Sequence, residues 1–69
     1  MSPFITLTLA VEYDDVEVTL NAIMVEAFFA SASIAGVTEV RTTSGKGYNV
    51  RETYEVVKER VAAGLRWEA

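Results

Sequence analysis

The chain has 69 residues, of which 51% are hydrophobic, and a formal net charge of −4. This length allows one domain, residues 1–69, with a small core, because a chain of about 60 residues buries only ~60% of the surface that its unfolded form exposes. The absence of cysteine and histidine excludes disulfides, zinc–thiolate sites, haem ligation and Ser-His-Asp catalysis. We expect no cofactor and no metal, and we expect a second subunit to stabilise the small core.

The charges are distributed unevenly along the chain. Residues 1–40 carry six acidic side chains and no basic one, whereas residues 41–69 carry six basic and four acidic side chains. The two parts therefore have net charges of −6 and +2. A net-acidic chain disfavours nucleic acid as a partner, because that affinity rises with the number of phosphates neutralised. The asymmetry is either a solvated surface or an acidic face that meets the basic face of a neighbouring subunit.

We expect no targeting signal in the N-terminal part of this sequence. The first basic residue is Arg41, and the most apolar stretch, residues 22–37, is 16 residues long and contains Glu26. A secretory signal needs a basic start, and a membrane helix needs ~20 apolar residues. We therefore expect a cytoplasmic protein that does not bind a membrane.

The first two segments predict a hairpin. Residues 4–11 and residues 16–21 each alternate apolar and polar side chains, which is the period of a half-buried strand. Asp14 and Asp15 lie between them, so the hairpin has an acidic tip. The spacing of these carboxylates matches no calcium-binding loop, and we interpret them as turn formers and edge charges.

Residues 22–35 fit two structures. Asn21 can cap a helix that Gly36 ends, and the alanine content slightly favours this helix. The alternative is a strand with Val25 and Phe29 on one face and Met24 and Phe28 on the other. Such a strand is apolar on both faces apart from its glutamate, so a second subunit would have to cover one face.

The second half predicts two more strands and a helix. Residues 37–43 form a strand, residues 44–47 a glycine-rich turn, and residues 48–50 a short returning strand. Apolar residues at helical spacing predict a helix over residues 53–63, with Thr53 as its N-cap and Gly64 just beyond its end. The predicted core is Leu7, Leu9, Val18, Leu20, Val40, Val50, Val57 and Val61.

Three segments resemble a known family. Val18–Asn21, Val25–Glu26 and Ser44–Lys58 resemble the small flagellar FlbD (SwrD) proteins and their phage-encoded relatives. Those proteins share a strand ending in Leu-Asn, an Ile-Glu strand, and a Gly-Lys turn that leads into a C-terminal helix. The resemblance covers residues 4–61, and the chain departs from it between Phe28 and Gly36, where it carries additional residues.

The resemblance implies a small, highly curved sheet closed by one helix, and it favours a strand over Met24–Ser31. Together with the alternating segments, it predicts an α+β, mainly β fold: a strongly bent antiparallel sheet of about five strands, SH3- or Sm-like, with one C-terminal helix. It also implies a bacterial or phage-encoded accessory or modulator protein, acting in the host cytoplasm where it is phage-encoded.

Nothing in the sequence selects a catalytic site, and we expect no enzyme. The leading hypothesis is a homo-oligomeric interaction protein that engages another protein, with an interface led by Met24, Phe28 and Phe29. The alternative is a protein that holds a small anionic, nucleotide-like ligand between subunits. Its candidate residues surround one hairpin and combine cations with an aromatic ring: Arg41, Lys46, Tyr48 and Arg51. The third hypothesis, a nucleic-acid-binding Sm-like module, is disfavoured by the net charge.

Overall fold

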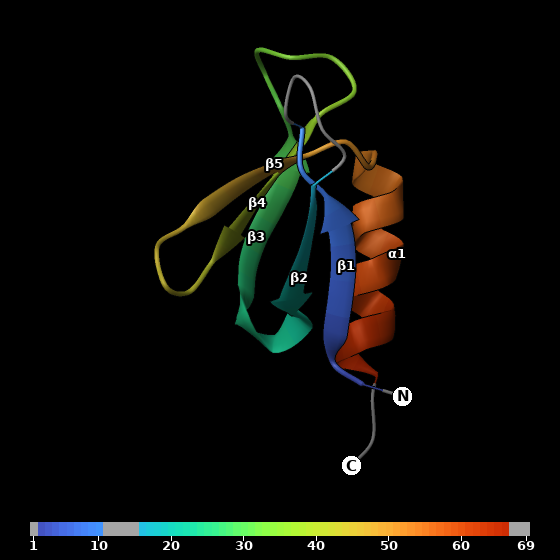
Figure 1. Cartoon of the computed structure of the whole chain (residues 1–69). Helices are drawn as coiled ribbons and strands as arrows, with labels where there is room; N and C mark the ends of the chain where they lie inside the picture. Colours follow the sequence, from blue (N-terminus) through green and yellow to red (C-terminus); the bar gives the residue numbers. More distant parts are fainter. Residues whose placement is uncertain (1, 11–15, 67–69) are drawn as a thin grey trace.

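The computed structural model describes residues 2–10 and 16–66. Five strands and one C-terminal helix make up this part of the chain, which confirms the predicted α+β, mainly β fold (Figure 1). The elements are β1 (Phe4–Thr8), β2 (Glu17–Asn21), the short 3₁₀ turn η1 (Ala22–Met24), β3 (Val25–Ala30), β4 (Thr38–Thr42), β5 (Gly47–Val50) and α1 (Tyr54–Leu65). The predicted acidic tip of the first hairpin, at Asp14 and Asp15, lies outside the described residues.

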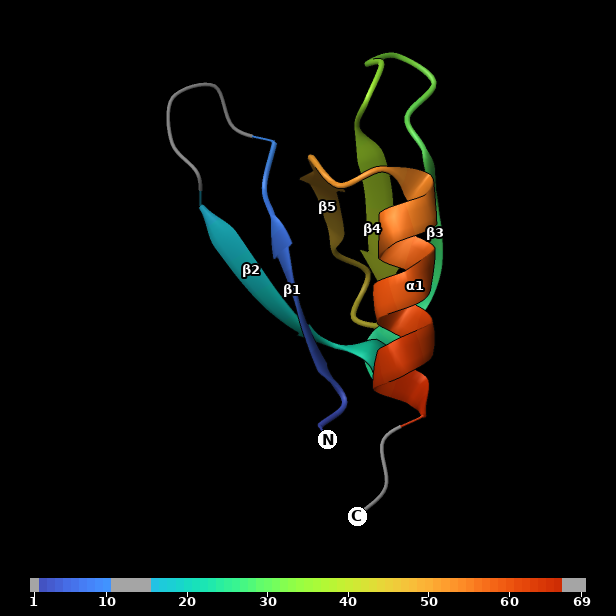
Figure 2. The ribbon, with the colours of Figure 1, turned by 90° about the vertical axis from the view of Figure 1, so that its right-hand side faces the viewer.

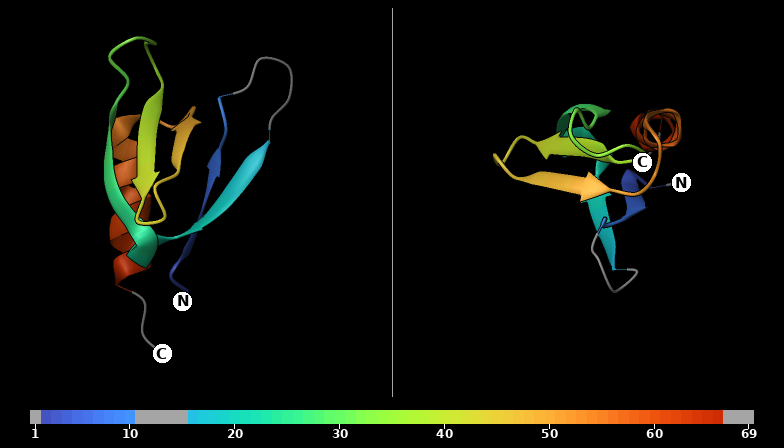
Figure 3. Two further views of the ribbon diagram at one scale, coloured as in Figure 1. Left: turned by 90° about the vertical axis from the view of Figure 1, so that its left-hand side faces the viewer. Right: turned by 90° about the horizontal axis from the view of Figure 1, so that it is seen from above.

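The strands form two antiparallel sheets that meet at one corner. One sheet is β1-β2 and the other is β3-β4-β5. At the corner Leu9 bridges Val50, the Arg51 N–H donates to the Thr8 carbonyl over 2.8 Å, and the Ala10 N–H donates to the Asn49 carbonyl over 2.8 Å. The spatial order is therefore β2-β1-β5-β4-β3, a bent array that stays open between β2 and β3 (Figure 3).

The core lies where α1 packs between the two sheets. The helix contacts β1, β3 and η1 and covers the inner face of the three-stranded sheet (Figure 2). Six of the eight predicted core residues are buried, and Leu9 and Val18 are half-buried against them. The prediction left out Ile5 and Ala22, which belong to the same cluster.

The helix that composition favours over residues 22–35 is wrong, and the strand alternative is confirmed. The Asn21 side chain does cap, accepting the Ile23 N–H over 3.0 Å, but it caps only the single turn η1. From Val25 onward the chain pairs with β4. Pairing and packing of this segment override the helix propensity of its alanines, which is a weak preference.

A β-bulge in β3 changes which side chains face the core. The register shifts between Val25 and Ala27, and one extra residue reverses the alternation beyond it. Phe28, predicted on an outer face with Met24, instead lies opposite Val40 and packs against the core. Its ring lies 5.5 Å from that of Tyr54, measured between centroids, so the helix covers it.

The ends of α1 follow one prediction and contradict another. Thr53 is the N-cap as predicted, and its hydroxyl accepts the Val56 N–H over 3.3 Å. Gly64 does not follow the helix but lies in its last turn, buried against β1 and η1. A Cβ at this position would lie 2.7 Å from the Ala22 Cβ and 3.1 Å from the Pro3 carbonyl oxygen. Close packing explains this glycine, not helix termination.

Candidate functional site

The structure separates the four residues predicted to bind an anionic ligand. Tyr48 pairs with Val40 and faces the core, where it is half-buried. Arg41 is the next residue along β4, so its side chain points to the outer face of the same sheet. The aromatic ring and this cation therefore lie on opposite sides of the β3-β4-β5 sheet.

The Arg41 guanidinium already has two neighbours on the outer face. Its Nε donates to Glu39 Oε2 over 2.6 Å, and its Cζ lies 5.9 Å from the centroid of the Phe29 ring. The ion pair offsets the charge of Arg41, and the cation–π contact orders the exposed Phe29 ring. Arg41 thus contributes to a surface that combines an aromatic ring with a salt bridge.

Lys46 and Arg51 lie at opposite ends of β5. Lys46 is in the β4–β5 turn, where Gly45 has a φ of +88° as the predicted tight turn requires. Arg51 follows the other end of the strand, about 16 Å away at the rise of an extended chain. In a single copy of the chain, the four candidate residues do not form one site.

The opening between the two sheets contains a groove of about 340 Å³. Tyr48 and Met24 line it together with the hydroxyl groups of residues such as Thr42 and Thr43. None of its lining side chains is charged. Of the four predicted ligand residues it includes Tyr48 alone, and its lining offers no cation to an anionic ligand.

The three residues predicted from sequence to form an interface also lie on different surfaces of the molecule. Phe28 packs inward, whereas Phe29 is 41% exposed and Met24 is 52% exposed. Phe29 and Met24 do not form one surface, because Met24 lies in η1 next to the Thr43 hydroxyl. Phe29 instead projects from β3, a strand at the edge of its sheet.

The free edge of β3 is the main unpartnered surface that strand order creates. The Ser31 N–H donates to the Val37 carbonyl over 2.8 Å, so alternate β3 residues hydrogen-bond to β4. By that alternation, the backbone N–H and C=O groups of Phe28 and Ala30 point away from β4. The edge also presents exposed apolar side chains, at Ala27, Phe29 and Ala30.

Side chains cover the C-terminal part of the β1 edge that faces away from β2, from the Thr6 carbonyl to the Thr8 N–H. Both carboxylate oxygens of Glu52 accept the Thr8 N–H, over 2.9 and 3.1 Å, and Arg60 Nη1 donates to the Thr6 carbonyl over 2.8 Å. Arg60 Nη1 also lies 3.2 Å from Glu52 Oε2. This ion pair takes the place of a neighbouring strand where β5 has ended.

Burial raises the pKa of Glu52, but the hydrogen bonds from Thr8 and the charge of Arg60 outweigh it and hold the pKa below 4.5.

Residues 2–10 and 16–66 contain no group of three or more His, Cys, Asp or Glu placed to hold a metal ion. In the same ranges, no helix has the length and apolar character to cross a membrane. No family model, curated protein or solved structure matches this chain.

Proposed function

We propose that this protein is a small, non-enzymatic interaction protein that self-associates through the free edge of β3. The observation that carries the proposal is an apolar edge strand whose backbone groups at Phe28 and Ala30 point away from β4 and have no partner among residues 2–10 and 16–66. Unpaired N–H and C=O groups on an edge strand are a template for pairing with another chain. The resemblance to FlbD proteins extends the proposal to a bacterial or phage-encoded accessory protein that acts in the cytoplasm and engages a further protein.

Two copies of β3 fit one another in antiparallel pairing about a two-fold axis. With Phe28 of one copy opposite Phe28 of the other, Glu26 faces Ala30, so the two carboxylates do not meet. Phe29 then lies opposite the small side chain of Ala27 on the outer face. The two three-stranded sheets join into one of six strands, an isologous arrangement that closes as a dimer.

Sedimentation equilibrium at micromolar concentration tests this proposal. We expect a mass about twice 7.6 kDa. Ala30→Pro should reduce the mass to that of one chain, because it removes an N–H that points away from β4 and leaves the β3–β4 hydrogen bonds in place. Phe29→Lys should weaken association by removing the apolar contact on the outer face.

The matched control is Ile34→Lys. Ile34 is 53% exposed in the β3–β4 connection, away from the paired edge, so the dimer should persist. Circular dichroism should show that each variant is folded. A wild-type mass of 7.6 kDa at every concentration, or equal dissociation by Ile34→Lys and Ala30→Pro, rejects the proposal. Phe28→Lys is not informative, since Phe28 packs against the core.

A further inference from the structure

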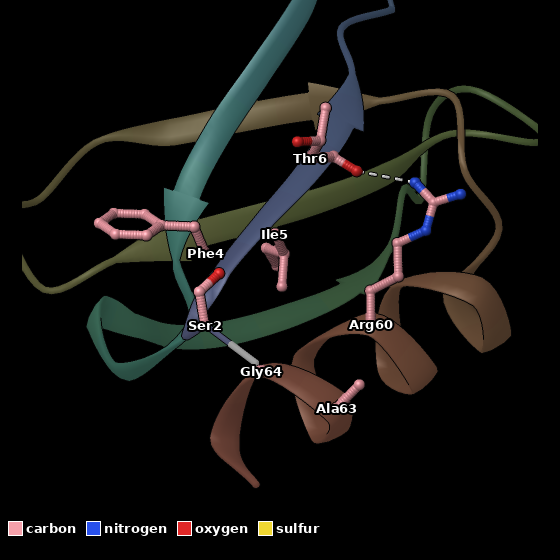
Figure 4. Close-up of a pocket in the computed structure, with 7 residues that line it drawn as sticks. All are labelled: Ser2, Phe4, Ile5, Thr6, Arg60, Ala63 and Gly64. Atoms are coloured by element: carbon pink, nitrogen blue, oxygen red, sulfur yellow. Dashed lines mark hydrogen bonds between the residues drawn. The ribbon is translucent and has the colours of Figure 1, made fainter. Parts of the chain in front are cut away.

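A second unpartnered surface lies on the other side of the molecule, between β1 and α1. Here a groove of about 410 Å³ is lined by Ser2, by Phe4, Ile5 and Thr6 from the strand and by Arg60, Ala63 and Gly64 from the helix (Figure 4). Phe4 is 59% exposed beside it. The lining is apolar apart from the strand backbone, two hydroxyl groups and one guanidinium.

The backbone of β1 offers two donors and one acceptor along this groove. The Ala22 N–H donates to the Pro3 carbonyl and the Leu9 N–H to the Val16 carbonyl, so alternate residues of β1 hydrogen-bond to β2. Phe4 and Thr6 therefore direct their N–H and C=O groups away from β2. Of these groups, the Thr6 C=O accepts a hydrogen bond from Arg60. The Phe4 N–H, the Phe4 C=O and the Thr6 N–H have no hydrogen-bond partner within residues 2–10 and 16–66.

The helix contacts β1 and the residue before it at two points along the groove. At one end Arg60 bridges from α1 to the Thr6 carbonyl, the dashed line in Figure 4. At the other end Gly64 packs so tightly that a Cβ would lie 3.1 Å from the Pro3 carbonyl oxygen. Three strand steps separate Pro3 from Thr6, or about 10 Å. A segment of this length accommodates the last residues of a chain.

Arg60 provides a cation at the Thr6 end. Its Nη1 makes the bonds to Thr6 and Glu52, and its Nε and Nη2 make none within the described part of the chain. The side chain is 45% exposed. A guanidinium that is fixed through one nitrogen and open at the others is suited to bind a carboxylate.

From these features we propose that the groove binds the C-terminus of a partner protein whose last residue is apolar. The peptide runs parallel to β1, so its terminal carboxylate reaches Arg60. The N–H of its last residue donates to the Phe4 C=O, and its carboxylate accepts from the Thr6 N–H and from Arg60. Parallel pairing uses this combination, the carbonyl of one residue and the N–H of the residue two further along. The site is separate from the β3 edge and does not depend on self-association.

Titration of the ¹⁵N-labelled protein with short peptides tests the site. The probes are acetyl-Ala-Ala-X tripeptides, with X as Leu, Phe or Val, each with a free C-terminal carboxylate or a C-terminal amide. We expect saturable shifts of the Phe4 and Thr6 amides with the free acids and at least tenfold weaker binding of the amides. Arg60→Gln should remove this preference for the acid.

Two further variants separate binding from folding. Ala63→Glu places a carboxylate in the groove while keeping Arg60, and we expect it to abolish binding of the free acids. Lys58→Gln removes one positive charge from an exposed position of α1 outside the groove and should leave the affinity unchanged. Equal binding of acid and amide, shifts that map to other residues, or no saturable shift with any of the three acids would each overturn the proposal.

Discussion

At the scale of single residues, Glu52 links three parts of the fold. Its carboxylate accepts the Thr8 N–H from β1 and contacts Arg60 of α1, and its carbonyl accepts the hydroxyl of the buried Thr38 over 2.7 Å. The carboxylate is bonded in its charged form, which is why its pKa lies below 4.5 although burial opposes ionisation. Ionisation of Glu52 therefore favours the folded state.

The depressed pKa makes the stability depend on pH with a defined sign. The contribution of Glu52 to the free energy of unfolding is complete above pH 4.5, which is the pKa of this carboxyl in the unfolded chain. It is lost as the pH falls through the lower pKa of the folded state. Glu52→Gln should lower the free energy of unfolding at pH 7 by about 1–2 kcal/mol and flatten its decline in acid. Urea unfolding at pH 7 and at about pH 3 measures both effects. Glu59→Gln, on the exposed face of α1, is the control, and an equal loss there would contradict the assignment.

At the scale of elements, the contact of α1 with β1 and η1 depends on Gly64. The helix approaches so closely that a side chain at this position would overlap Ala22. Alanine is a better helix former than glycine by about 1 kcal/mol, so propensity and packing have opposite signs here. Overpacking a core costs about 1–3 kcal/mol, and we expect packing to dominate.

Gly64→Ala is thus predicted to destabilise the protein, and Ala22→Gly in the same chain should recover part of the loss. The second substitution removes the Cβ that lies 2.7 Å from the added one. A double-mutant cycle by thermal unfolding measures the coupling between the two positions. Additive effects, or a stabilised Gly64→Ala protein, would show that the helix can shift without cost.

The elements also show which features a single sequence reveals. The first two strands were predictable because one face is buried and the other solvated, so apolar side chains alternate. The bulge in β3 interrupts this alternation, and Phe28 was therefore assigned to the wrong face. Arg41 and Tyr48 are close in sequence but lie on opposite faces of a sheet, so proximity along the chain did not make a site. The β3 edge and the β1–α1 groove depend on strand order, which no local pattern encodes.

At the scale of the whole molecule, strands that follow one another in the chain are neighbours in space except β2 and β3, and one further contact joins strands distant in the chain. The array is open between β2 and β3, and β1 meets β5 at the corner. The sheet β3-β4-β5 is built from short connections, whereas the bond between Thr8 and Glu52 joins residues separated by 44 positions. The local and the distant contacts therefore differ in the chain entropy that their formation costs.

This corner has a consequence for folding kinetics. Closing the loop of 44 residues between Thr8 and Glu52 costs about 3 kcal/mol in chain entropy. We therefore expect the antiparallel meander β3-β4-β5 to form in the transition state and the corner between β1 and β5 to close afterwards. Glu52→Gln should then accelerate unfolding and leave the folding rate nearly unchanged, whereas Val40→Ala, in the central strand of the meander, should slow folding. Stopped-flow measurements in urea separate the two rates, and a slower folding limb for Glu52→Gln would place corner closure before the transition state. A protein that closes its corner last also opens it first, so β1 and β2 detach from the remaining sheet before the meander unravels.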